Sequence, residues 1–136
     1  MGCNNNVESA GPNLCNSPIP QINQGTTLNP TKTLQFTLND KSTGKPVDLS
    51  TATALVVNFP ATNTAGFIQK TLGSGVTVVT PGQLGVFQVV LQSVDVALLV
   101  TSIISVTAYV TNATLTNEPC QFLNALQVNP PPFPGA

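Results

Sequence analysis

Residues 32–38 read Lys-Thr-Leu-Gln-Phe-Thr-Leu, and apolar and polar side chains alternate along the whole stretch. In an extended chain, Leu34, Phe36 and Leu38 lie on one face, and the threonines and glutamine between them lie on the other. The alternation therefore predicts a β-strand with one face in a core and the other in water.

Similar short runs, rich in β-branched residues and separated by turn residues, follow at intervals of roughly ten residues. This spacing is typical of an all-β sandwich or barrel. The continuously apolar run at 53–59 predicts a strand buried on both faces, and 93–100 predicts a helical turn with Ser93 as its N-cap and Asp95 near its positive end. With 32–38, the expected strands number seven, the others being 53–59, 67–72, 76–80, 86–91, 103–111 and 119–128.

The two ends of the chain have a different composition. Residues 1–31 are rich in Asn, Gly, Ser and Pro, and the sparse apolar content predicts an extended arm that becomes ordered only on a partner. Three consecutive prolines in 129–136 predict a stiff Pro-rich tail. The expected organisation is a docking arm at 1–31, a β-sandwich at 32–128 and the tail at 129–136.

Charge is scarce, which excludes several classes of function. Only 7% of the residues are charged, the formal net charge is −1, and the chain has no histidine. Without a basic patch we expect no nucleic-acid partner, and without histidine the usual proton shuttle at neutral pH is missing. A surface of amides and hydroxyls suits a protein that packs against other subunits, including copies of itself.

Targeting and membrane signals are also weak. No basic stretch followed by an apolar one opens the chain, so the sequence predicts synthesis in the cytoplasm. The apolar run at 96–110 is shorter than the roughly 20 residues that a membrane-crossing helix needs. We therefore expect no membrane partner.

The three cysteines leave one question open. Cys3 and Cys15 lie in the arm and could form a disulfide in an oxidising environment or remain thiols. Cys120 lies in a late apolar run without a basic neighbour that would lower the pKa of its thiol, so we expect a buried structural residue.

The carboxylates do not form a catalytic pattern. Asp40 and Asp48 flank one turn, where they could share a cation, but hydrogen bonds that cap the turn are the favoured interpretation. Asn112-Ala113-Thr114 matches a glycosylation sequon without an accompanying secretory signal, and Gly73-Ser74-Gly75 predicts a hairpin bend rather than a phosphate loop. The prediction is no catalytic, cofactor-binding or metal-binding residue; the carboxylates are Glu8, Asp40, Asp48, Asp95 and Glu118.

Three motifs support a resemblance. They are Gly44-Lys-Pro-Val-Asp-Leu49, Gly85-Val-Phe-Gln-Val-Val-Leu91 and Ser93-Val-Asp95. This layout, over about residues 32–128, resembles the immunoglobulin-like domain of tailed-bacteriophage virion proteins, notably the amino-terminal domain of baseplate upper proteins. The resemblance implies an immunoglobulin-like β-sandwich of about seven strands.

The function that the resemblance implies is structural and non-enzymatic. We expect a subunit of a bacteriophage particle, in the baseplate, the neck or a capsid accessory or cement position, that assembles with other virion proteins and with its own copies. Its location would be the virion, after synthesis in the host cytoplasm. The alternative is an adhesion module that binds host surface carbohydrate, for which exposed aromatic side chains would be the expected sign.

Overall fold

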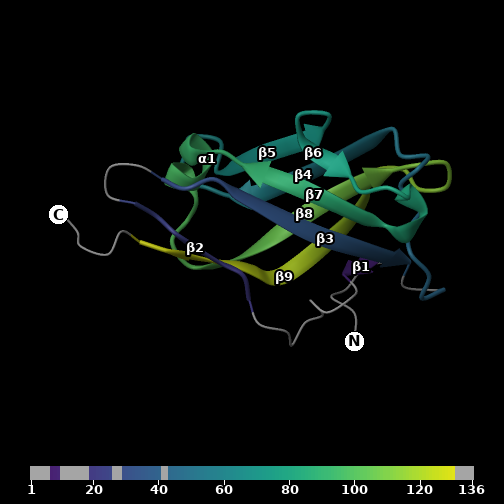
Figure 1. Ribbon diagram of the computed structural model, residues 1–136, viewed down its shortest axis with the longest axis horizontal. Coiled ribbons are helices and arrows are strands. Elements are labelled where there is room, and N and C mark those ends of the chain that lie inside the picture. The colour runs from purple at the N-terminus through teal and green to yellow at the C-terminus, as the bar shows by residue number, and fades with distance from the viewer. Residues whose placement is uncertain (1–6, 10–18, 26–28, 41–42, 131–136) are drawn as a thin grey trace.

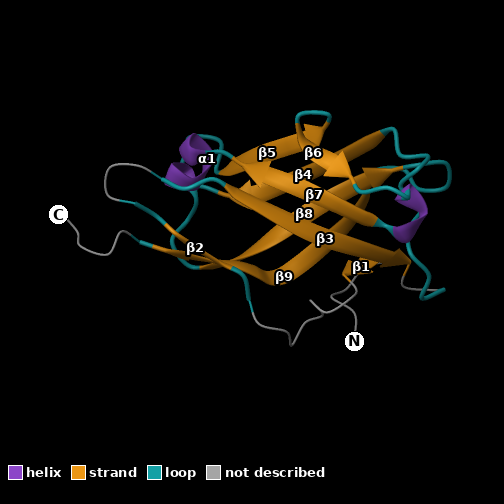
Figure 2. Cartoon of the chain, viewed as in Figure 1, coloured by secondary structure: helices purple, strands orange, loops and turns teal. Residues whose placement is uncertain are grey.

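The computed structural model describes residues 7–9, 19–25, 29–40 and 43–130. It confirms the all-β class, and the seven predicted strands are present with ends shifted by at most two residues (Figure 1). Helical structure among these residues is limited to the short helix α1 (Ser93–Leu98) and the 3-10 turn η2 (Gly82–Leu84) (Figure 2). The strands are β1 (Val7–Ser9), β2 (Gln21–Asn23), β3 (Lys32–Asp40), β4 (Ala54–Pro60), β5 (Phe67–Leu72), β6 (Gly75–Val78), β7 (Val86–Leu91), β8 (Ile103–Thr111) and β9 (Glu118–Asn129).

The nine strands form one hydrogen-bonded series in the order β1-β3-β7-β6-β5-β4-β8-β9-β2. Its two ends approach each other, since β1 lies in contact with β9, so the sheet curls into a near-barrel. Two of the pairings are parallel, β5 with β6 and β2 with β9, and the others are antiparallel. The sheet is therefore mixed.

The sheet turns from one half to the other between β5 and β6. Only Gly73 and Ser74 separate these two strands, which pair in parallel through Thr71–Gly75 and Leu72–Val76. Gly73 and Gly75 have φ values of 86° and 99°, a backbone region that residues with a Cβ rarely adopt. The predicted tight bend is present, but the expectation of a hairpin was wrong, because β5 and β6 pair in parallel and the bend changes the direction of the sheet.

Alternating side chains from the strands fill the interior. In β4, Leu55, Val57 and Phe59 are fully buried, whereas the residues between them are half-buried. The expectation that this strand is buried on both faces was wrong, because its second face looks outward and carries Asn58. In β8 the predicted inward face is confirmed: Ile104, Val106, Ala108 and Val110 are all buried.

Three phenylalanines join the two halves across the core. The ring centroid of Phe36 on β3 lies 5.3 Å from that of Phe87 on β7 and 4.7 Å from that of Phe122 on β9. Because β9 and β3 are separated in the strand order, the Phe36–Phe122 contact shows that side chains from distant strands of the curled sheet meet in its interior. Contacts of this kind stabilise by aromatic packing beyond the area they bury.

Two of the sequence motifs meet at one end of the sheet. The N–H of Leu38 donates to the carbonyl of Gly85 at 2.8 Å, and the N–H of Val47 donates to the carbonyl of Leu38 at 3.0 Å. A Cβ on Gly85 would lie 2.5 Å from the carbonyl oxygen of Leu38, and φ at Gly85 is 73°. The 44–49 turn and the glycine before β7 are therefore parts of one interlocked cluster that needs glycine at position 85.

Helix α1 follows β7 as expected, but its cap differs from the prediction. The N-cap is Gln92 rather than Ser93, and the Gln92 N–H donates to the Asp95 carboxylate at 2.8 Å. The same carboxylate pairs with the Lys70 ammonium at 2.7 Å, with both side chains mostly buried. Asp95 therefore attaches the helix start to β5.

Part of the segment expected to form a docking arm belongs to the domain itself. β2 pairs in parallel with the end of β9, which continues to Asn129. The Ile22 side chain is 3% exposed, and the Gln24 amide donates to the carbonyls of Val96 and Leu99 at 2.9 and 3.3 Å. The expectation that the whole of 1–31 needs a partner to become ordered was wrong for two stretches. Residues 7–9 form β1, which pairs with β3 of the same chain, and one buried isoleucine and one buried amide hold 19–25 in place.

Truncating Ile22 tests this attachment. We expect Ile22→Ala to lower the free energy of unfolding by about 2 kcal/mol, because it removes buried methylene groups at the edge of the core. Ile103→Ala is the matched control, since Ile103 is 49% exposed and its truncation costs about 0.5 kcal/mol. Denaturant unfolding measures both values, and equal small losses would mean that β2 does not stabilise the domain.

Candidate docking surface between β2 and β3

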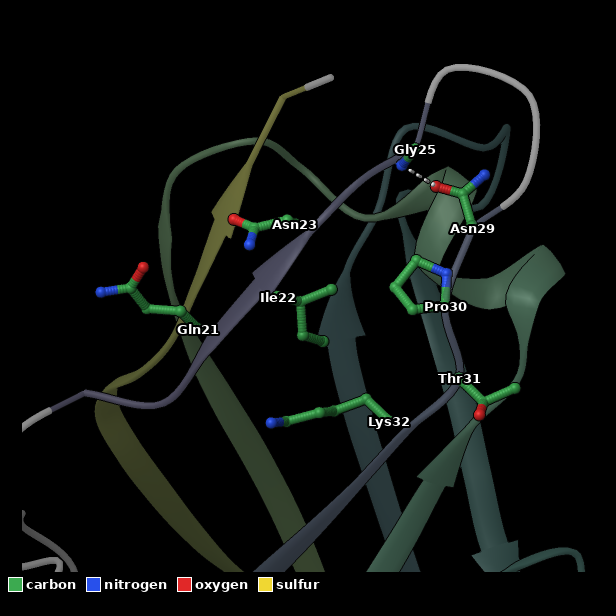
Figure 3. Close-up of a pocket in the computed structure, with 8 residues that line it drawn as sticks. All are labelled: Gln21, Ile22, Asn23, Gly25, Asn29, Pro30, Thr31 and Lys32. Atoms are coloured by element: carbon green, nitrogen blue, oxygen red, sulfur yellow. Dashed lines mark hydrogen bonds between the residues drawn. The ribbon is translucent and has the colours of Figure 1, made fainter. Parts of the chain in front are cut away.

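A hollow of about 590 Å³ lies between β2 and the start of β3. Figure 3 shows its walls coming from two segments of the chain, with Ile22 on one side and Pro30 and Lys32 on the other. The N–H of Gly25 donates to the Asn29 side-chain oxygen at 3.2 Å, which ties the two segments together. The lining residues are Gln21, Ile22, Asn23, Gly25, Asn29, Pro30, Thr31 and Lys32.

A network of side-chain amides builds the β2 wall. The Asn129 amide donates to the Asn23 side-chain oxygen at 2.7 Å and to that of Gln21 at 3.2 Å, and its own oxygen accepts from Gln127 at 3.0 Å. The two bonds donated by Asn129 cross from β9 to β2, so side chains support the parallel backbone pairing. The wall is consequently polar and uncharged.

Amide pairs continue over the outer face of the sheet. Gln88 on β7 donates to Gln35 on β3 at 3.2 Å, and Gln69 on β5 donates to Asn58 on β4 at 3.1 Å. Cross-strand pairs of this kind stabilise neighbouring strands without adding charge. The uncharged surface anticipated from the composition is thus organised into hydrogen-bonded pairs.

The groups around the hollow limit its chemistry. Its eight lining residues include no carboxylate, no cysteine and no aromatic ring, and Lys32 carries their only charge. In the part of the chain that the structure describes, no group of three or more metal-ligating side chains gathers. This surface can therefore bind a partner through hydrogen bonds from amide side chains and backbone groups.

Two polar residues of the sequence motifs, Asp48 and Asn112, have structural roles. The Asp48 carboxylate accepts from the Ser50 N–H at 2.9 Å, which confirms turn capping at this position. The Asn112 side-chain oxygen accepts from the N–H groups of Thr114 and Leu115 at 2.9 and 2.8 Å, and its amide donates to the Asp48 carbonyl. Asn112 therefore organises its loop and connects it to the 44–49 turn.

Of the three cysteines, only Cys120 lies in the part of the chain that the structure describes. Cys120 is buried in the core, as predicted. Cys3 and Cys15 lie outside the described residues, as do most of the predicted arm and residues 131–136 of the predicted tail.

Comparisons with known proteins add no relative. No protein-family model, no curated protein and no solved structure matches this chain. In the described ranges, the helices are all too short and too polar to cross a membrane.

The hollow between β2 and β3 was not predicted from the sequence. Its β2 wall comes from Gln21-Ile22-Asn23, a single apolar residue between amides in a Pro-rich segment, and three residues are too few to give a periodic signal. The one available sign was the clustering of amides at 21–24 and at 127–129, on segments far apart in the chain.

Proposed function

We propose that this chain is a non-enzymatic structural protein of a bacteriophage particle, acting by protein–protein assembly. Its partners are other virion proteins and further copies of itself, and its location is the virion after synthesis in the host cytoplasm. The position in the particle is the baseplate, the neck or a capsid accessory or cement site. The motifs at 44–49, 85–91 and 93–95 support the virion family, and the structure places the first two in one turn cluster.

The strand order supports an immunoglobulin-like sandwich as the finer description of the fold. In such domains one sheet has the order A-B-E-D and the other contains C-F-G, with C′ beside C in variable-type domains. Here β1-β3-β7-β6 follows the first order and β5-β4-β8-β9 follows the second. The β5–β6 pairing joins the two sheets into one continuous series, which is the departure from a simple sandwich.

One observation carries the assembly role: the sheet keeps an open strand edge in a chain with 7% charged residues. β1 covers only Leu38–Asp40 of the outer side of β3, so residues 33–37 have no strand on that side among the described residues. Soluble proteins commonly block such edges with charge, proline or a bulge. An unblocked edge on a weakly charged surface favours association.

The amino-terminal segment is the expected second contact. A chain that begins at Ile19 keeps Ile22 and Gln24 in the domain and removes residues 1–18, which include the three-residue edge strand β1. We expect the full chain to form a discrete oligomer and the shortened chain to form a smaller, folded species with the same far-ultraviolet circular dichroism per residue. Size-exclusion chromatography with light scattering measures both, and identical oligomers would show that residues 1–18 do not contribute to assembly.

The alternative function is adhesion to host surface carbohydrate, and the amide-lined hollow favours it. Gln21, Asn23 and Asn29 offer donors and acceptors of the kind that bind sugar hydroxyls. The hollow has no aromatic lining residue on which a sugar ring could stack. A glycan array with the purified chain separates the two functions, because binding that is lost in Asn23→Ala would support adhesion.

A further inference from the structure

Residues 19–25 lie in a groove that other parts of the chain build. β2 pairs in parallel with residues 127–129 of β9. Two further backbone bonds extend this pairing, because the Gln127 N–H donates to the Pro20 carbonyl at 2.9 Å and the Gln24 N–H donates to the Asn129 carbonyl at 3.0 Å. The segment is therefore bonded to the edge of β9 from Pro20 to Gln24.

Two alternate side chains of this segment enter the domain. Ile22 lies opposite Val128, and both side chains are buried. Two residues later, the buried Gln24 amide donates to the carbonyls of Val96 and Leu99. Backbone pairing combined with pockets for alternate side chains is the way in which extended peptides bind the edge of a sheet. The groove therefore recognises an extended segment in which glutamine follows an aliphatic residue by two positions.

The same segment has little attachment to the strand that follows it in the chain. The hollow lies between β2 and the start of β3, and the bond from the Gly25 N–H to the Asn29 side chain spans the connection (Figure 3). The other hydrogen bonds that join residues 19–25 to described residues go to β9, to α1 or to Leu99 at its C-cap. A second chain with this segment would make the same contacts with β9 and α1.

We propose that the groove beside β9 accepts residues 19–25 of a second copy of this chain in place of its own. The partner is a second copy because the segment that fits this groove belongs to the chain itself. Each copy carries both the segment and the groove, so an exchange leaves every groove filled. The proposal rests on the self-association proposed above, and it deepens it by naming the segment that is exchanged and the groove that receives it.

The exchange has a low free-energy cost for this segment. The contacts with β9 and α1 are the same in both arrangements, so only the connection near Gly25 and the freedom lost on association differ. One buried isoleucine and one buried amide hold the three-residue strand, and an element with so few buried contacts detaches while the rest of the domain stays folded. Because association depends on concentration, we expect exchange at high protein concentration.

Two full-length chains, each with one introduced cysteine, test the exchange. One carries Asn23→Cys and the other Asn129→Cys, at positions that lie opposite each other in the β2–β9 pairing and hence within disulfide range. Both also carry Cys3→Ser and Cys15→Ser, which leaves the buried Cys120 as the other cysteine. The chains are mixed at millimolar concentration, diluted to micromolar concentration and treated with oxidised glutathione. We expect a disulfide-linked heterodimer on non-reducing electrophoresis.

Gln69→Cys in place of Asn23→Cys is the control for random collision. Gln69 is also an exposed amide on a strand, but it lies on β5, and we expect at least about tenfold less heterodimer because exchange does not bring it to Asn129. Adding Ile22→Ala to the Asn23→Cys chain should lower the yield at least about fivefold, since it removes the buried side chain of the segment. Adding Ile103→Ala, at an exposed isoleucine, should change the yield less than about twofold.

A heterodimer yield equal to that of the Gln69→Cys control would overturn the exchange, and so would a yield that Ile22→Ala leaves unchanged. Gln21→Cys mixed with Gln127→Cys repeats the measurement at the neighbouring opposed pair, and circular dichroism of each variant confirms that it is folded. An oligomer found by light scattering without the heterodimer would keep the self-association and overturn the exchange. Conversely, exchange in a chain that is absent from purified particles would keep this inference and remove the virion role.

Discussion

Replacing Phe87 by alanine is expected to lower the free energy of unfolding by about 3–5 kcal/mol. Phe87 is fully buried, and its ring packs against Phe36 on the neighbouring strand and Phe122 on the facing half. The substitution removes the ring that both partners contact and leaves a cavity where the two halves of the sheet meet. Denaturant-induced unfolding followed by circular dichroism measures the loss.

Phe67→Ala is the matched control for this prediction. Phe67 lies on β5 and is 41% exposed, so the same truncation is expected to cost about 1 kcal/mol or less. A loss at Phe87 no larger than that at Phe67 would contradict the packing of β9 across β3 and β7.

Gly85→Ala is expected to lower the free energy of unfolding by about 2–5 kcal/mol, from two separate causes. The left-handed backbone at φ 73° costs a residue with a Cβ about 1–2 kcal/mol. The added Cβ would also lie 2.5 Å from the Leu38 carbonyl oxygen and 3.1 Å from that of Val47, so the turn cluster must shift, at about 1–3 kcal/mol. Thermal and denaturant unfolding both report this change.

Gly66→Ala separates the two causes. Gly66 has φ of 83°, but a Cβ there meets nothing within 4 Å, so only the backbone term applies and the loss is about 1–2 kcal/mol. If the two alanine variants lose the same stability, the 44–49 turn does not pack against Gly85 as described, and the structural link between the two motifs fails.

Much of the fold follows from local patterns that the sequence displays. The alternation at 32–38 and at 103–111 identifies strand and inward face together, because a half-buried strand repeats every two residues. For the run at 53–59, the prediction of burial on both faces was wrong. Val56 is apolar, but the face that it shares with Asn58 looks outward. Where both faces of a strand carry apolar residues, periodicity does not show which face is buried, and only the tertiary arrangement decides this.

The amino-terminal segment shows what local patterns cannot supply. Ile22 is the core residue of a three-residue strand, and its partner, Val128, lies more than a hundred residues further along the chain. Gln24 belongs to the core for a similar reason, because its amide donates to the carbonyl of Val96 within α1 and to that of Leu99, the C-cap residue. Pairings this distant depend on the assembled sheet, so the composition of 1–31 suggested an arm where the fold has the short strands β1 and β2.

The open edge of β3 could not be predicted either, because it also depends on distant pairings. The sequence shows that 33–37 is uncharged, but it does not show that the described pairing of β1 with β3 ends at Leu38. Similarly, the hollow beside β2 forms from segments whose amides are brought together by the parallel β2–β9 pairing.

The proposed role as a repeated structural part of a bacteriophage particle can be tested on the particles themselves. The measurement is quantitative mass spectrometry of density-purified particles from the culture that produces the chain, combined with immunogold labelling by an antibody against it. We expect many copies per particle, in constant ratio to the major particle proteins, with gold at regular positions on the head, neck or tail. Particles that lack the chain while it accumulates in the particle-free fraction would contradict this role.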